Sequence, residues 1–142
     1  MSTKKVLSLG QCAADHASIA GMLRRHFDAQ VDEAATFADA ESQLNAGRYD
    51  LVLVNRVLDR DGTEGLDFIE RIKTHPSLHQ LPVMLVSNYP EAQQEAITRE
   101  ALPGFGKSRL DSAKTLRRLR AVLGDPAGAG PSGQESDQLT RP

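Results

Sequence analysis

The residues best suited to chemistry in this sequence follow a short, valine-rich apolar run, Leu51–Val54. The run is too short for a buried helix, and it predicts a strand that is covered on both faces. Asn55 ends it, and a polar loop with Asp59 and Asp61 follows. In open α/β sheets, ligands and reacting groups lie at the carboxyl ends of the strands. The crevice around Asn55 is therefore the candidate site.

Other predicted strands bring further residues to this crevice. Small or polar residues follow three of them: Gly10 and Gln11 after Val6–Leu9, Ser87 after Leu81–Val86, and Lys107 after a short strand placed by alternation at Pro103–Gly106. Ser87 could orient a ligand, or it could bond the backbone at a strand end. Lys107 could bind an anion, hydrogen-bond Asn55, or remain a solvated lysine.

Helix signals separate the strands. Asp15 is expected to cap the first helix, since a carboxylate can accept the free amides of a first turn. Thr36 with Asp39 three residues later resembles a capping box, and Asp111 or Ser112 is expected to cap the last helix. Five strand–helix alternations with right-handed crossovers predict a doubly wound (βα)5 flavodoxin-like α/β fold. A weak second strand at 29–34 and very apolar third and fourth strands favour the parallel order 2-1-3-4-5.

Composition limits the classes of function. The chain has 142 residues and a net charge of −2, which gives no argument for binding nucleic acid or a membrane. All but one of its 17 basic and all but three of its 19 acidic residues precede residue 125. We expect one domain at 1–124 and a disordered tail or linker at 125–142. The single Cys12 offers no disulfide or zinc spacing, and no run is long enough for a membrane span or signal peptide, so we expect a cytoplasmic protein.

From Lys4 to about Gly124 the chain resembles the receiver domains of bacterial response regulators. The resemblance implies an acidic, Mg²⁺-binding pair after the first strand, a phosphoacceptor aspartate after the third, a hydroxyl after the fourth and a lysine after the fifth. Those positions fall on Gly10 and Gln11, on Asn55, on Ser87 and on Lys107. Ser87 and Lys107 match the family pattern. The three anionic positions do not.

These losses share one chemical consequence. Mg²⁺ prefers oxygen ligands, usually carboxylates, and an amide cannot serve as the carboxylate nucleophile. We therefore expect a pseudo-receiver that signals by protein–protein contact, with no cofactor, no metal and no enzymatic activity. Its partner would be a histidine kinase or another signalling protein. Two alternatives stay open: phosphotransfer through a displaced acceptor such as Asp59 or Asp61, and a small-ligand sensor at the crevice.

The last predicted helix carries a cluster of basic residues, Lys114, Arg117, Arg118 and Arg120. Such a cluster could be a solvated helix face that complements the helix dipole. In receivers, however, the face of the fourth helix, fifth strand and fifth helix carries the output, so the resemblance implies a partner surface here. The preceding helix holds Glu91, Glu95 and Glu100, so a weak two-fold homodimer is also expected.

Overall fold

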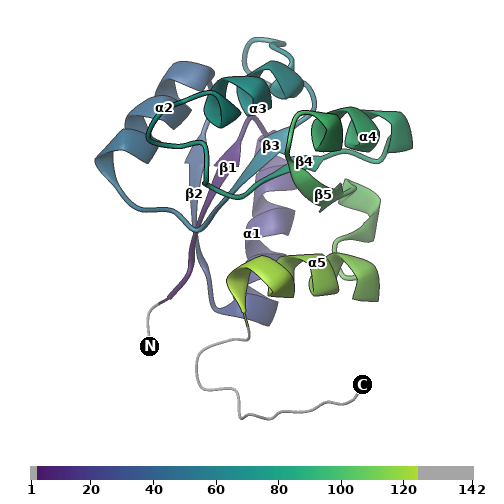
Figure 1. Ribbon diagram of the computed structural model, residues 1–142. Helices are drawn as coiled ribbons and strands as arrows, with labels where there is room; N and C mark the ends of the chain where they lie inside the picture. The colour runs from purple at the N-terminus through teal and green to yellow at the C-terminus, as the bar shows by residue number, and fades with distance from the viewer. Residues whose placement is uncertain (1–2, 125–142) are drawn as a thin grey trace.

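A computed structural model describes residues 3–124 as a five-stranded parallel sheet (Figure 1). The order β2-β1-β3-β4-β5 confirms the predicted topology. The strands are β1 (Lys5–Leu9), β2 (Gln30–Ala34), β3 (Leu51–Asn55), β4 (Val83–Val86) and β5 (Leu102–Phe105). The expected tail at 125–142 lies outside the described residues.

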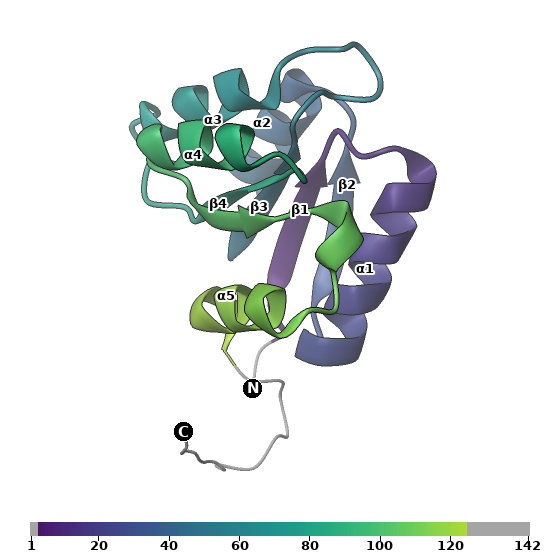
Figure 2. The ribbon, with the colours of Figure 1, turned by 90° about the vertical axis from the view of Figure 1, so that its right-hand side faces the viewer.

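Helices cover both faces of the sheet (Figure 2). α2 (Phe37–Ala46), α3 (Gly65–Lys73) and α4 (Pro90–Thr98) lie on one face, and α1 (Ala13–Phe27) and α5 (Ala113–Leu123) lie on the other. A short 3₁₀ turn, η1 (Lys107–Arg109), joins β5 to α5. Within residues 3–124, none of the helices has the length and apolar character that crossing a bilayer requires.

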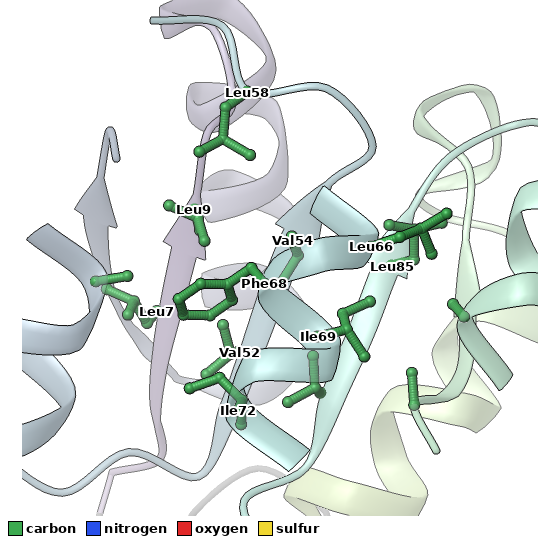
Figure 3. Packing of buried hydrophobic residues seen from close by; sticks show 14 of the residues in the cluster. Leu7, Leu9, Val52, Val54, Leu58, Leu66, Phe68, Ile69, Ile72 and Leu85 are labelled. Atoms are coloured by element: carbon green, nitrogen blue, oxygen red, sulfur yellow. The ribbon is translucent and has the colours of Figure 1, made fainter. Parts of the chain in front are cut away.

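The sheet separates two apolar layers. Every residue of β3 is buried, with Val52 and Val54 in the layer under α2, α3 and α4 and Leu51 and Leu53 in the layer under α1 and α5. Figure 3 shows the first layer, where Phe68 of α3 packs among side chains of β1 and β3. Side chains on a strand alternate between its faces, so a strand covered on both sides must be apolar throughout.

The observed N-terminal caps agree with the sequence prediction at α2 and α5 and differ from it at α1. The Thr36 hydroxyl accepts a hydrogen bond from the Asp39 amide at 3.1 Å, and Ser112 accepts one from the Thr115 amide at 3.2 Å. The expectation that Asp15 caps α1 is wrong. Cys12 occupies the N-cap position without a side-chain cap, and Asp15 lies in the first turn of the helix.

The edge strand β5 is held by a side chain as well as by its neighbour β4. The register between β4 and β5 shifts between Met84 and Val86. The Gln93 amide nitrogen of α4 donates to the Leu85 carbonyl at 2.9 Å, and its oxygen accepts from the Gly104 amide at 3.0 Å. The Gln93 side chain thus bridges the two strands where their ladder is irregular.

Gly104 should tolerate no side chain at this bridge. A Cβ there would lie 2.1 Å from the Leu85 carbonyl oxygen and 3.1 Å from Gln93 Oε1. We predict that Gly104→Ala lowers the free energy of unfolding by about 1–3 kcal/mol in urea titrations, because backbone would have to move.

Gly21→Ala is the matched control. Its new Cβ would meet only Arg25 Nη1, at 3.4 Å, inside α1. Removing a mid-helix glycine should raise stability by about 0.5–1 kcal/mol. A Gly104→Ala variant as stable as the parent would refute the close-approach argument.

Candidate functional site

Asn55 lies at the carboxyl end of β3 with 9% of its surface exposed. Its amide nitrogen donates two hydrogen bonds, to the Gly10 carbonyl at 2.9 Å and to the Val57 carbonyl at 2.8 Å. Its amide oxygen accepts from the Arg56 backbone at 3.1 Å. An ionised carboxylate has no hydrogen to donate, so aspartate could not form the first two bonds.

The loop that follows Asn55 folds back over the end of β1. Leu58 is 1% exposed and packs onto Gly10, where a Cβ would lie 2.5 Å from Leu58 Cγ. Figure 3 places Leu58 beyond the carboxyl end of β1, next to Leu9. The Gly10 carbonyl also accepts from the Asp59 amide at 2.9 Å. An apolar side chain therefore fills the space over Gly10.

Sequence reasoning missed Leu58. The available signal was weak: an apolar Val57-Leu58 pair inside a polar loop. The structure closes this loop with a bridge between Val57 and Glu64 and a hydrogen bond from the Leu58 amide to the Thr63 carbonyl at 2.9 Å.

The residues at the receiver metal position do not fit Mg²⁺. Gly10 has no side chain, and Gln11 is neutral and only 6% exposed. Neither amide atom of Gln11 has a hydrogen-bond partner in the described part of the chain. Residues 3–124 contain no group of three or more His, Cys, Asp or Glu residues that could hold a metal ion. A hard dication would find neutral groups where it needs carboxylates.

Lys107 forms an ion pair with an acidic side chain at this end of the sheet. Its ammonium group contacts the Asp15 carboxylate at 2.7 Å, with each side chain about one-third exposed. The hydrogen bond from Lys107 lowers the pKa of Asp15, with a smaller contribution from Cys12. The ion pair links the end of β5 to the first turn of α1. Asp15 is thus the ion-pair partner of Lys107 and not a helix cap.

A depression of about 290 Å³ remains beside these groups, and Asn55, Ser87 and Lys107 all line it. The structure thus brings these three predicted residues together. The Ser87 hydroxyl accepts from the Tyr89 amide at 3.1 Å, so it is engaged within its own loop. Tyr89 is 56% exposed, and the Arg56 guanidinium lies 5.1 Å from its ring centroid, a contact that sequence reasoning missed.

Asp59 and Asp61 lie in the exposed loop. The Asp61 carboxylate accepts from the Thr63 amide at 3.0 Å and from its hydroxyl at 2.6 Å. These hydrogen bonds lower the pKa of Asp61. This is the geometry of an Asx turn.

The basic residues of α5 differ in their surroundings. Arg118 is half-buried and donates through Nη1 to the Gly104 carbonyl at 2.5 Å. Lys114, Arg117 and Arg120 are exposed. The predicted partner surface therefore combines one half-buried arginine, Arg118, with three exposed basic residues.

No family model matches the sequence, and no curated protein matches it. The fold, by contrast, has many solved counterparts. The signal receiver domain of a DNA-binding response regulator (merR) from Colwellia psychrerythraea 34H superposes with a TM-score of 0.71 at 19% identity, over 84% of this chain and 98% of that one. The chemotaxis response regulator CheY4 of Vibrio cholerae gives 0.65 at 20% identity, over 86% of this chain and 100% of that one.

A third counterpart is the Mn²⁺-bound form of the response regulator Rcp1, with a TM-score of 0.60 at 19% identity over 85% of this chain and 90% of that one. The fold is that of receiver domains. At these identities the likeness concerns the fold alone.

Asn55 supplies a test of the site geometry. We predict that Asn55→Asp lowers the free energy of unfolding by about 2–4 kcal/mol, because it removes two donated bonds and sets a charge against two carbonyl oxygens. The loss in urea titrations should be at least as large as for Asn55→Ala, although aspartate has the same shape. The difference in the free energy of unfolding between Asn55→Asp and Asn55→Ala should become smaller at acid pH, because a protonated aspartate carboxyl can donate one hydrogen bond. An aspartate variant as stable as the parent would show that the donor role of Asn55 is wrong.

Proposed function

We propose that this chain is a pseudo-receiver: a signalling module with the receiver fold that works by protein–protein contact, without phosphorylation, metal or enzymatic activity. The observation that carries the proposal is the pair of hydrogen bonds from the Asn55 amide to the Gly10 and Val57 carbonyls. A phosphoacceptor needs a carboxylate at the end of β3. In this chain the side chain at the end of β3 must instead donate hydrogen bonds to two carbonyl groups.

The surroundings support the same function. Leu58 takes the space over Gly10, and the Lys107 ammonium is already neutralised by Asp15. Phosphoryl transfer depends on cations that offset developing negative charge. Among residues 3–124, neither a cluster of metal-ligating side chains nor an unpaired lysine lies beside Asn55. The Ser87 hydroxyl is already engaged by the Tyr89 amide. We infer that the module holds one conformation and acts as a fixed binding surface.

We place the partner contact on the face formed by α4, β5 and α5. The exposed apolar residues Ile97 and Leu102, each 38% exposed, lie on this face. α4 also carries the exposed acids Glu91 and Glu95, and α5 carries the exposed base Arg117. An edge strand offers backbone groups to a partner, and charges of both signs favour a two-fold contact between copies or an equivalent contact with another signalling protein.

The lack of phosphorylation can be tested by intact-mass spectrometry after incubation with acetyl phosphate and Mg²⁺. We expect no added phosphoryl group on the parent chain, and none on Asn55→Asp, because the metal ligands would still be missing. A receiver that accepts phosphate under the same conditions is the positive control. A stoichiometric mass gain on the parent chain would overturn the proposal. Its loss in Asp59→Asn or Asp61→Asn would then identify a displaced acceptor.

The partner face can be tested by charge reversal. Arg117→Glu should weaken self-association in sedimentation experiments at low salt, with a small effect because exposed charge pairs contribute about 0–1 kcal/mol. Arg24→Glu on α1 makes the same charge change away from this face. Combining Arg117→Glu chains with Glu95→Arg chains should restore association. If Arg24→Glu and Arg117→Glu weakened self-association equally, α5 would take no part in the contact.

A further inference from the structure

A groove of about 600 Å³ runs between α4, β5 and α5. Gln93 of α4, Gly104 and Phe105 of β5, and Thr115 of α5 are among its lining residues. Small-molecule pockets in proteins span roughly 300–1,000 Å³, so the groove is large enough for a ligand of nucleotide size.

All the charged side chains that line this groove are positive. Arg109, Lys114 and Arg118 line it, and none of its lining residues is acidic. In the part of the chain that the structure describes, the Arg109 and Lys114 side chains make no ion pair. Cations gathered in a concave surface attract anions more strongly than the same charges spread over a flat one.

The Arg118 side chain is held in a position from which it can bind an anion. One guanidinium nitrogen is held by the Gly104 carbonyl, and the side chain is half-buried. The remaining N–H groups of a guanidinium form a planar fork that matches phosphate oxygens. Because the side chain is already fixed, little rotamer entropy is lost when a ligand binds.

The start of α5 adds backbone donors at the same place. Ser112 accepts from the Thr115 amide, which leaves the amides of Ala113 and Lys114 without an acceptor among residues 3–124. The first turn of a helix carries a partial positive charge, and its free amides favour negative groups.

The amide oxygens of both carboxamide side chains that line the groove already accept hydrogen bonds. Asn88 Oδ1 receives the Ser108 amide at 3.2 Å and the Ser108 hydroxyl at 3.0 Å. Gln93 Oε1 receives the Gly104 amide. The groove therefore offers a surplus of donors and positive charge.

We propose that this groove binds the phosphate group of a small phosphate ester of nucleotide size. A phosphate ester carries several acceptor oxygens in a tetrahedral arrangement, and it can engage two arginine forks, one lysine and helix amides together. The proposal goes beyond the protein contact proposed above, because it assigns a small ligand to the groove and does not require a partner on this face.

The test is a ¹H–¹⁵N NMR titration of the whole chain with AMP, with adenosine as the ligand that lacks phosphate, and with a glutamate tetrapeptide as a carboxylate anion. We expect AMP at low salt to shift the amides of Gly106, Arg109, Lys114 and Thr115, and adenosine to leave them unchanged. Arg109→Gln combined with Lys114→Gln should weaken AMP binding by about tenfold or more.

The matched control is Arg24→Gln combined with Arg48→Gln, which removes two exposed charges that do not line the groove. Its affinity for AMP should stay within about twofold of the parent. All four positions are exposed, and amide dispersion in the same spectra verifies folding. Three outcomes would each overturn the phosphate assignment. AMP could cause no shifts of the groove amides, both pairs of substitutions could weaken AMP binding equally, or the glutamate peptide could bind as tightly as AMP. Loss of self-association in Arg117→Glu with normal AMP binding would separate this site from the proposed protein contact.

Discussion

One amide nitrogen, that of Asn55, donates the two hydrogen bonds on which the carboxyl end of the sheet depends. They tie the end of β1, through the Gly10 carbonyl, to the loop after β3, through the Val57 carbonyl. The loop is thereby drawn down so that Leu58 packs onto Gly10. A carboxylate at the same position would donate neither bond and would set a negative charge against two carbonyl oxygens, so this arrangement favours an amide there.

The neutral side chain of Asn55 also bears on the electrostatics at this end of the sheet. With no carboxylate at residue 55, the Lys107 ammonium has no acid beside it on β3, and it bonds Asp15 of α1 at 2.7 Å. The ion pair lowers the pKa of Asp15, so its contribution to stability is present above the ordinary carboxyl pKa and is lost as the pH falls through the lowered value. The pair is partly exposed, and its contribution is small.

Sequence patterns predicted the sheet order, because the central strands of a parallel sheet, such as Leu51–Asn55, are apolar on both faces and the crossovers have one hand. They also placed Asn55 and Ser87 at one crevice. They did not predict the Asp15–Lys107 pair, since a residue three positions into a helix looks like a cap until the fold brings a distant lysine to it. Leu58 was missed for a similar reason: a single apolar loop residue has no periodicity, and its burial depends on a glycine on another strand.

The bridge made by Gln93 has a mechanical consequence. Its side chain bonds the Leu85 carbonyl of β4 and the Gly104 amide of β5 while its backbone belongs to α4. A helix that lies over a sheet can usually slide a little, since apolar packing has no direction. Here a sliding motion of α4 would break directional bonds to two strands at once. We therefore expect α4 and the edge strand β5 to move together, since a displacement of the helix would pull on β5 through the Gln93 side chain.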